Sequence, residues 1–414
     1  MTTTKNNEHK KLNVPNLRFP EFQGEWEESS IGEMFDLYSG NTPSRLNKEH
    51  FKGTVNWISS GELKEHYIYS SKEQISEEAA KSLKLLPVGT FVIAIYGLEA
   101  EGVRGTGSIT QEPSTISQAC MSFISKGVIE NEFLYSWYKK HGNVIGIRYA
   151  QGTKQQNLSY DILEKFRIAY PNTKEQEKLN KFISLLDERI ATQNKIIDKL
   201  QSLIKGMEDN LLDNPLWEKT YLRSFMQFFP TNSLSWEQLS YKEGAIRNLH
   251  YGLIHGFQTH GINSASLPMI KNEATPKQYT LCQVGDVAFA DASEDTDEIG
   301  KSVEFVDTIE GDTICGLHTI HGRDIKNRTV VGFKGFAFNS RYFHNQIKRL
   351  AQGTKIFSIT ANNLSSCYVY LPDFDTQKAI VKLLKAYEEK LLVSKRLLEQ
   401  YEKQKQYLLR QMFI

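Results

Sequence analysis

A seven-residue pattern occurs twice in the chain at a fixed distance. Arg-Tyr-Ala-Gln-Gly-Thr-Lys at 148–154 returns as Arg-Leu-Ala-Gln-Gly-Thr-Lys at 349–355, 201 residues later. The same offset, without a gap, relates Pro171 to Pro372 and Gln176 to Gln377. Because 201 residues is about half of a 414-residue chain, the repeat predicts two copies of a whole domain and excludes a solenoid of short units.

A long amphipathic pattern follows each of the two repeated prolines. Apolar side chains recur there at alternating steps of four and three residues, which is the seam of a coiled coil over more than four heptads. The seams contain Leu179, Ile183, Leu186, Ile190, Ile197, Leu200 and Ile204, and then Ile380, Leu384, Leu391, Leu398 and Leu408. Each pattern predicts a helix of roughly 35 residues, about 50 Å long at 1.5 Å per residue.

The simplest way to bury two narrow stripes in one chain is to pack them on each other. Polar Gln193 and Ser394 occupy the same position in the two heptad series. If a two-fold axis relates the copies, the helices run antiparallel, and we favour that arrangement. The alternative is that each helix packs on its own domain, which the charged flanks of both stripes make less favourable.

The rest of each half contains short strand-like runs separated by loops. Residues 90–96 follow a Val-Gly pair and residues 284–290 begin with one, and 165–170 and 366–371 each lead into a repeated proline. Trp26 and Trp236 open the two globular regions at an offset of 210, so loop lengths differ between the copies. The sequence therefore predicts an α+β fold, with two mixed α/β domains in tandem joined and separated by two long helices that form an antiparallel coiled coil.

The expected segments follow from these patterns. They are an N-terminal arm at 1–24, a first domain at 25–170, a central helix at 171–213, a linker at 214–233, a second domain at 234–371 and a C-terminal helix at 372–414.

Composition and charge exclude several classes of protein. The net charge is +1, so a strongly basic protein is excluded but a local basic groove is not. Cys120, Cys282, Cys315 and Cys367 have no C-x-x-C spacing, which argues against a disulfide framework or a zinc site and suits the cytoplasm. The sequence contains no run of 18 apolar residues, so we expect no membrane span. The polar start through Lys11 predicts a disordered arm without a signal peptide.

The sequence contains no catalytic motif that we would defend. It has no P-loop, no H-E-x-x-H and no G-x-S-x-G. We interpret the Gly-rich run at 102–107 as a loop between strands, and His250, His255, His260, His318 and His321 as loop or core residues rather than metal ligands. The acidic run at 291–298 lacks calcium-loop spacing, so we interpret it as a solvated loop.

Polar and basic residues on predicted turns are the candidates for binding phosphate. Cations and hydroxyls beside glycine backbone N–H groups are the groups that contact nucleic-acid backbones. The candidates are Thr42, Ser44, Arg45, Arg104, Arg148, Lys154, Arg349 and Lys355. The repetition of Lys154 as Lys355 favours a shared role, although it also fits a turn that only shapes the chain.

In its order of motifs the chain resembles the DNA-specificity subunits of type I restriction–modification enzymes. The resemblance is carried by Val-Pro-Asn-Leu-Arg-Phe-Pro-Glu-Phe at 14–22, Trp26 and Gly-Asn-Thr-Pro-Ser at 40–44. It continues with the two Ala-Gln-Gly-Thr turns, the two prolines, and Leu-Leu-Asp-Glu-Arg-Ile at 185–190 on the first helix. It covers nearly the whole chain, and the doubled arrangement is the specific part. The second half departs from it, with residues 251–256 in the place of 40–44.

The resemblance implies a division of labour among several chains. Two target-recognition domains each read one half of a bipartite, asymmetric site on double-stranded DNA, and the helix pair sets the gap between the half-sites. Two methyltransferase subunits dock on the helices, and two motor-nuclease subunits join that core. This chain then has no catalytic residues and binds no metal or cofactor, whereas S-adenosylmethionine, ATP and Mg belong to its partners. The expected location is the cytoplasm.

Two other functions remain as hypotheses. A coiled-coil adaptor whose globular domains bind proteins would show a flat salt response, whereas DNA binding weakens steeply with salt. A stand-alone nuclease or methyltransferase would be active without partners, and the missing motifs disfavour it.

Overall fold

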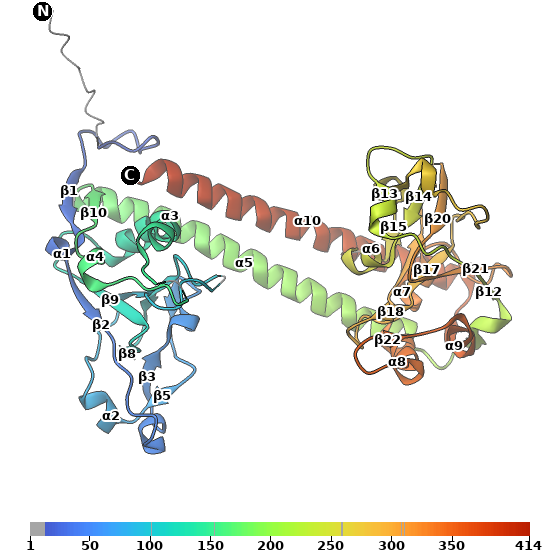
Figure 1. Ribbon diagram of the computed structural model, residues 1–414, viewed down its shortest axis with the longest axis horizontal. Coiled ribbons are helices and arrows are strands. Elements are labelled where there is room, and N and C mark those ends of the chain that lie inside the picture. Colours follow the sequence, from blue (N-terminus) through green and yellow to red (C-terminus); the bar gives the residue numbers. More distant parts are fainter. Residues whose placement is uncertain (1–12, 101, 153, 258–259, 308, 310) are drawn as a thin grey trace, which may run out of the picture. The chain divides into compact units, whose positions relative to one another are not determined.

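The computed structural model describes residues 13–414, except 101, 153, 258–259, 308 and 310. The chain divides into a first unit, residues 1–192 with 398–414, and a second unit, residues 193–397. Each unit has a globular part built on strands and one half of a pair of long helices (Figure 1). The disordered arm predicted through Lys11 lies outside the described residues.

The globular part of the first unit contains three sheets, a main hydrophobic core and a smaller cluster around Trp57 and Ile75. A five-stranded sheet has the order β2-β9-β6-β7-β4, a three-stranded sheet the order β5-β3-β8, and β1 pairs with β10. The strands are β1 (Glu27–Ser30), β2 (Phe35–Ser39), β3 (Val55–Ile58), β4 (Tyr67–Ile68), β5 (Gln74–Ile75), β6 (Phe91–Ala94), β7 (Gly107–Thr110), β8 (Ser114–Ile116), β9 (Cys120–Ser125) and β10 (Arg167–Tyr170). The helices are α1 (Ile31–Met34), α2 (Glu77–Lys81), α3 (Asn131–Tyr149) and α4 (Tyr160–Leu163).

The globular part of the second unit repeats this topology and adds the strands β13, β18 and β22. Its five-stranded sheet has the order β12-β21-β17-β19-β15, β16-β14-β20 repeats β5-β3-β8, and β11 pairs with β23. The strands are β11 (Glu218–Tyr221), β12 (Met226–Phe229), β13 (Leu239–Ser240), β14 (Ile246–Leu249), β15 (Gly261–Ile262), β16 (Met269–Ile270), β17 (Val287–Ala290), β18 (Ala292–Ser293), β19 (Ser302–Phe305), β20 (Asp312–Cys315), β21 (Thr319–Asp324), β22 (Phe357–Ser358) and β23 (Tyr368–Leu371). The helices are α6 (Tyr251–Gly256), α7 (Phe333–Ala337), α8 (Arg341–Leu350) and α9 (Ala361–Ser366).

The directions of pairing also match, which confirms the predicted duplication. Each five-stranded sheet has three antiparallel pairs and one parallel edge pair, β4 with β7 and β15 with β19. Strand register aligns the two copies residue by residue. Tyr38 lies opposite Ser122, and Phe229 lies opposite His321.

This alignment corrects two equivalences inferred from the sequence. Trp26 directly precedes β1, and Trp217, not Trp236, directly precedes the equivalent strand β11. The turn at 40–44 follows β2, and its counterpart follows β12 at 230–234, not at 251–256, which forms α6. Sequence spacing misplaced both because residues 214–233, expected to be a linker, contain β11 and β12, which pair with β23 and β21.

A buried glutamine ties each long helix to the globular part of its unit. Gln176 donates to the carbonyls of Pro171 and Val128 and accepts from the N–H of Glu130. Gln377 makes the same three bonds with Pro372, Arg328 and Val330. Both side chains are fully buried. The repeated Pro-x-x-x-x-Gln spacing is therefore a joint that fixes the start of each helix, and we call it the glutamine joint.

The long helices, α5 (Thr173–Leu212) and α10 (Phe374–Met412), pack together and run antiparallel (Figure 1). In the first unit the guanidinium of Arg189 lies 4.5 Å from the ring centroid of Tyr401. In the second unit Gln193 Nε2 donates to the carbonyl of Ser394 at 3.1 Å. Gln193 and Ser394 are copies of each other, and two copies contact each other only at the midpoint of an antiparallel pair. The predicted fold class is confirmed.

The seam residues divide into two kinds of contact. All are buried or half-buried. Near the helix ends they join a domain core: Leu179, Ile183 and Leu408 in the first unit, and Ile380 and Leu384 in the second. The helices therefore pack on the globular parts at their ends and on each other between them, so both arrangements weighed from the sequence occur.

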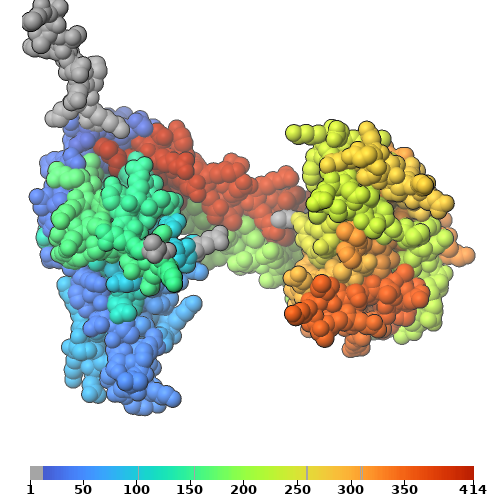
Figure 2. All heavy atoms as spheres, viewed as in Figure 1, coloured from blue at the N-terminus to red at the C-terminus, as the bar shows by residue number. Residues whose placement is uncertain are grey.

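The two ends of the described chain meet in the first unit. Leu17 N–H donates to the carbonyl of Gln411, and Phe413 packs against Phe133 with ring centroids 5.2 Å apart. The last residues, red in Figure 2, lie beside the dark blue residues that follow the grey segment. Arg18 forms a double hydrogen bond with Glu175, whose side chain is buried at the start of α5. Residues 13–24 are thus packed against the helix pair.

Candidate nucleic-acid interface

The turn after β2 is shaped by backbone hydrogen bonds. Gly40 N–H donates to Cys120 and Asn41 N–H to Ile116. A Cβ atom on Gly40 would lie 2.2 Å from the Ile116 carbonyl oxygen, so only glycine fits there. Thr42 is half-buried and Ser44 is exposed. The equivalent turn in the second unit is tied differently, since Asn232 donates to Asn248 and to the Cys315 carbonyl.

Arg45 is exposed but already has partners. Its guanidinium forms two 2.7 Å hydrogen bonds with Glu73 and lies 4.1 Å from the ring centroid of Phe51. The hydrogen bond from Arg45 is the main cause that lowers the pKa of Glu73. The charge of Arg45 is therefore largely offset where it stands.

The structure brings the Gly-rich loop and the repeated turn of the first unit together. Arg104 donates to Gln156, and Leu98 N–H donates to the Gln156 carbonyl. The loop connects β6 to β7, as predicted for residues 102–107. Arg148, at the end of α3, and Lys154 are both exposed on this turn. Three of the predicted phosphate-binding cations thus occur on segments that contact each other.

The repeated Ala-Gln-Gly-Thr turn has the same geometry in both units. Gln151 exchanges two backbone hydrogen bonds with Asn157, and Gln352 exchanges two with Ser358. Gly152 and Gly353 have φ values of +108° and +131°, and a Cβ atom on Gly353 would lie 1.9 Å from a carbonyl oxygen. The glycine is required by the backbone, so the repeat is explained by shape without a ligand.

The equivalent surroundings in the second unit are acidic. The β17–β19 connection, residues 291–301, replaces the Gly-rich loop. Its β18 pairs with β22 beside the repeated turn, and Lys348 forms an ion pair with Asp297. Arg349 and Lys355 are exposed. The two units therefore present different charges on the same scaffold.

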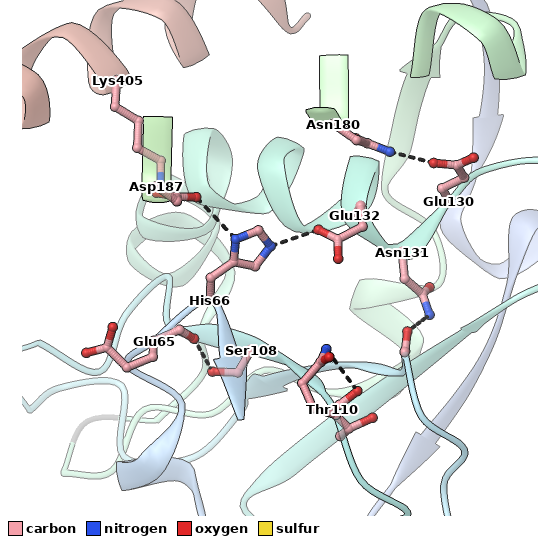
Figure 3. Close-up of polar contacts among 12 residues, drawn as sticks. Glu65, His66, Ser108, Thr110, Glu130, Asn131, Glu132, Asn180, Asp187 and Lys405 are labelled. Atoms are coloured by element: carbon pink, nitrogen blue, oxygen red, sulfur yellow. Dashed lines mark hydrogen bonds and ion pairs between the residues drawn. The ribbon is translucent and has the colours of Figure 1, made fainter. Parts of the chain in front are cut away.

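A half-buried histidine, which the sequence analysis did not single out, joins the sheet edge of the first unit to the helix pair (Figure 3). His66 Nδ1 lies 3.1 Å from Asp187 of α5, and Nε2 lies 2.8 Å from Glu132 of α3. The imidazole is stacked between Tyr67 and Tyr135, with centroids 4.1 and 3.9 Å away. Lys405 of α10 forms an ion pair with the same Asp187.

The second unit contains the equivalent contact. His260, which precedes β15 as His66 precedes β4, bonds Glu388 of α10 at 2.6 Å through Nδ1. Its Nε2 lies 3.9 Å from Glu208 of α5. Asp187 and Glu388 differ by the repeat offset of 201, whereas His66 and His260 differ by 194. Loop-length changes hid the pair from the sequence comparison, and we call each contact a histidine clasp.

The surroundings of both clasp histidines favour the protonated form of the imidazole. Burial lowers the pKa of His66, but hydrogen bonds to Asp187 and Glu132 outweigh it, so the net pKa is raised. The pKa of His260 is raised in the same way, chiefly by Glu388 against the effect of burial. When protonated, each imidazole holds a sheet edge to a helix by charge-assisted hydrogen bonds.

The other histidines that the sequence analysis singled out have structural partners. His250 caps α6 by accepting from Gly252 N–H, and His255 pairs with Glu298. His318 pairs with Asp291. His321 is buried and bonded to Asp286 at 2.7 Å.

Comparison of the chain with known protein families shows which family it belongs to. The family described as "Type I restriction modification DNA specificity domain" matches residues 23–202 and 316–403, which is more than half of the chain. The chain belongs to this family. It is a specificity subunit of a type I restriction–modification system, with two target-recognition regions and a helix pair. Specificity subunits are non-catalytic.

Three relatives come from Methanocaldococcus jannaschii. The MjaIX specificity subunit is 29% identical over 185 residues, which span 42% of each chain. The MjaVIII specificity subunit is 23% identical and aligns over 94% of this chain and 91% of its own length. The putative MjaX specificity subunit is 22% identical over 96% and 95% of the two chains.

Solved structures show the same fold. A crystal structure of the type I restriction–modification S subunit from M. genitalium aligns over 97% of this chain and 99% of its own, with a TM-score of 0.58 and 16% identity. A chain from a study of complex assembly and conformational transition of the type I system aligns over 93% and 96%, with a TM-score of 0.58 and 13% identity. Among the described residues no helix is long and apolar enough to cross a membrane.

Proposed function

We propose that each recognition domain of this subunit reads one half of a bipartite, asymmetric site on double-stranded DNA. The observation that carries the proposal is one topology present twice, with matched joints to the helices and unmatched loops. Two identical readers would select a symmetric site, whereas loops of different length and charge select different sequences. The domains in question are residues 25–170 and 234–371, to which the strands at 218–229 add the start of the second.

We further propose that the helix pair sets the gap between the half-sites and carries two methyltransferase subunits. A helix of 40 residues, such as α5, is about 60 Å long, longer than the ~34 Å turn of a DNA duplex. Apolar side chains exposed on the helices support a docking role, because such residues away from a core are typical of protein interfaces. They are Leu185, Ile196, Leu203, Leu383, Val393, Leu397 and Tyr407.

The partners would supply the chemistry that this chain lacks. In this proposal the methyltransferase subunits bind S-adenosylmethionine, and two motor-nuclease subunits use ATP and Mg in the cytoplasm. This chain contributes phosphate and base contacts. For the phosphate contacts we propose the exposed Ser44, Arg148, Lys154, Arg349 and Lys355, with Thr42, Arg45 and Arg104 beside them.

A domain exchange tests this function. Residues 25–170 would be replaced by the matching domain of another specificity subunit, and the methylated sites of the complete system would be mapped. We expect one half-site to change while the other half-site and the gap stay the same. The matched control is an exchange of 214–371, which must include β11 and β12 and should change only the other half-site. A change in both half-sites, or in neither, contradicts the modular reading.

A further inference from the structure

The second unit contains a compact group of metal-binding side chains, and no such group occurs among the described residues of the first unit. Cys282, Cys315 and His321 are all buried, and one ligand atom from each lies within 4.8 Å of the others. The two sulfur atoms are 3.6 Å apart. Cys282 lies in the segment before β17, 33 residues ahead of Cys315 at the end of β20, and His321 follows on β21 six residues later. No spacing motif predicted the group because strand pairing assembles it.

We propose that Cys282, Cys315 and His321 bind a zinc ion in the second recognition domain. Two thiolates and one imidazole are ligands that zinc accepts in tetrahedral sites, and soft sulfur ligands disfavour magnesium and calcium. Three protein ligands leave a fourth position for a water molecule.

The surroundings are arranged as those of a zinc site. Asp286 bonds His321 Nε2 at 2.7 Å. A carboxylate on the outer ring nitrogen is the usual way to orient a zinc-binding histidine, so in the proposed site Nδ1 would be the ligand atom. Arg323 and the N–H of Gln283 hold Asp286 in place. Thr313 lies two residues before Cys315 on β20, so its side chain is on the same face. Its buried Oγ1 has no protein partner among the described residues, and it offers an acceptor to a zinc-bound water.

The first unit shows that the fold does not need these side chains. Leu86 pairs with Ser114 as Cys282 pairs with Thr313, and Ile116 takes the position of Cys315. Ser122 takes the position of His321. Thr90 takes the position of Asp286, because Gly89 and Gly285 make equivalent hydrogen bonds to β7 and β19. Apolar and hydroxyl side chains fill these positions in one copy, and two thiols, an imidazole and a carboxylate fill them in the other. Simple packing of two small thiols explains neither the histidine nor the aspartate that orients it.

Zinc content of the purified full-length chain tests the site. The chain would be purified under reducing conditions, with its methyltransferase partners if it requires them, and reconstituted with zinc alone before dialysis. We expect about one zinc per chain in the wild type. We expect background levels in Cys282→Ala with Cys315→Ala, and no change in the control Cys367→Ala, a buried cysteine of the same unit outside the group. Cobalt in place of zinc should give thiolate charge-transfer absorption in the wild type and the control only.

Several outcomes would overturn the proposal. The site is rejected if the reduced wild-type chain holds no zinc after reconstitution, or if the double variant still binds zinc. It is also rejected if Cys282 and Cys315 are found as a disulfide in protein whose free thiols were blocked at lysis. If the alanine variant fails to fold, Cys282→Leu with Cys315→Ile installs the residues of the first unit. That chain should fold without zinc, and zinc bound to it at wild-type levels would equally reject the site. The result is independent of the proposed DNA function.

Discussion

The two recognition domains have the same frame but fill it differently. Where the first domain packs Ile109 against the core near Leu134, the second places Glu304 and Lys334, whose charged atoms lie 2.9 Å apart. The glutamine joint and the histidine clasp, by contrast, occur in both. The difference teaches that the attachment to the helices is repeated while the interior and the loops vary. This is the pattern expected of two different readers on matching supports.

The largest expected effect comes from the buried Lys334–Glu304 ion pair of the second domain, which occupies positions that are apolar in the first. Lys334→Leu leaves the carboxyl group of Glu304 buried without its partner, so we expect a loss of about 3–5 kcal/mol in the free energy of unfolding of that domain. Adding Glu304→Ile installs the apolar residues of the first domain and should recover most of the loss. Urea unfolding followed at the second domain measures both. A double variant no more stable than the single one would mean that the two frames are not equivalent.

The glutamine joint predicts equal effects in the two domains. Gln176→Ala and Gln377→Ala each leave a backbone donor and two carbonyls without partners, at a cost of about 1–3 kcal/mol. Hydrogen exchange at the start of α5 and of α10 should rise in the respective variant only. Gln193→Ala, in the middle of the helix pair, is the control and should leave both helix starts protected. If Gln176→Ala and Gln377→Ala lower the free energy of unfolding by strongly unequal amounts, the two glutamine joints are not equivalent.

The histidine clasp predicts a pH dependence in both domains. The pKa of His66 and of His260 is raised in the folded chain, so their contribution to stability is complete below about pH 6.5, the pKa of unfolded histidine. The contribution is lost as pH rises through the raised pKa. His66→Gln should cost about 1 kcal/mol at low pH and less at high pH, measured as the unfolding free energy of the first domain. His250→Gln is the control, because burial lowers the pKa of His250. An equal cost of His66→Gln at every pH would show that the clasp is uncharged.

The smallest expected effect concerns the exposed cations of the repeated turn. Lys154→Ala and Lys355→Ala should each weaken DNA binding by the whole complex for all sequences and lower the slope of log affinity against log salt by about one. Arg45→Ala should change the slope less, because Glu73 already neutralises Arg45. Titrations at several salt concentrations measure this. If neither lysine variant changes the slope of log affinity against log salt, the repeated turn has a structural role and does not bind phosphate.

The sequence predicted the elements that depend on local periodicity. It did not predict contacts that depend on how strands pair in the sheets. The helices, the repeat and the β6 and β10 strands follow from patterns within a few residues. Trp217 was missed as the counterpart of Trp26 because residues 214–233 look like a linker until β11 and β12 find partners about 95 to 150 residues away. The histidine clasps and the cysteine group were missed because their members come from different elements. The one signal that the sequence offers for the clasps is the 201-residue offset between Asp187 and Glu388.

The most direct test of two different readers on one chain is a map of methylated bases in cells that carry the complete system. The account predicts one bipartite, asymmetric motif with a fixed gap of unread bases. Inserting one heptad into both helices should lengthen that gap and leave both half-sites as they were. A single continuous motif, a palindromic motif, or a gap that ignores the insertion would contradict the account.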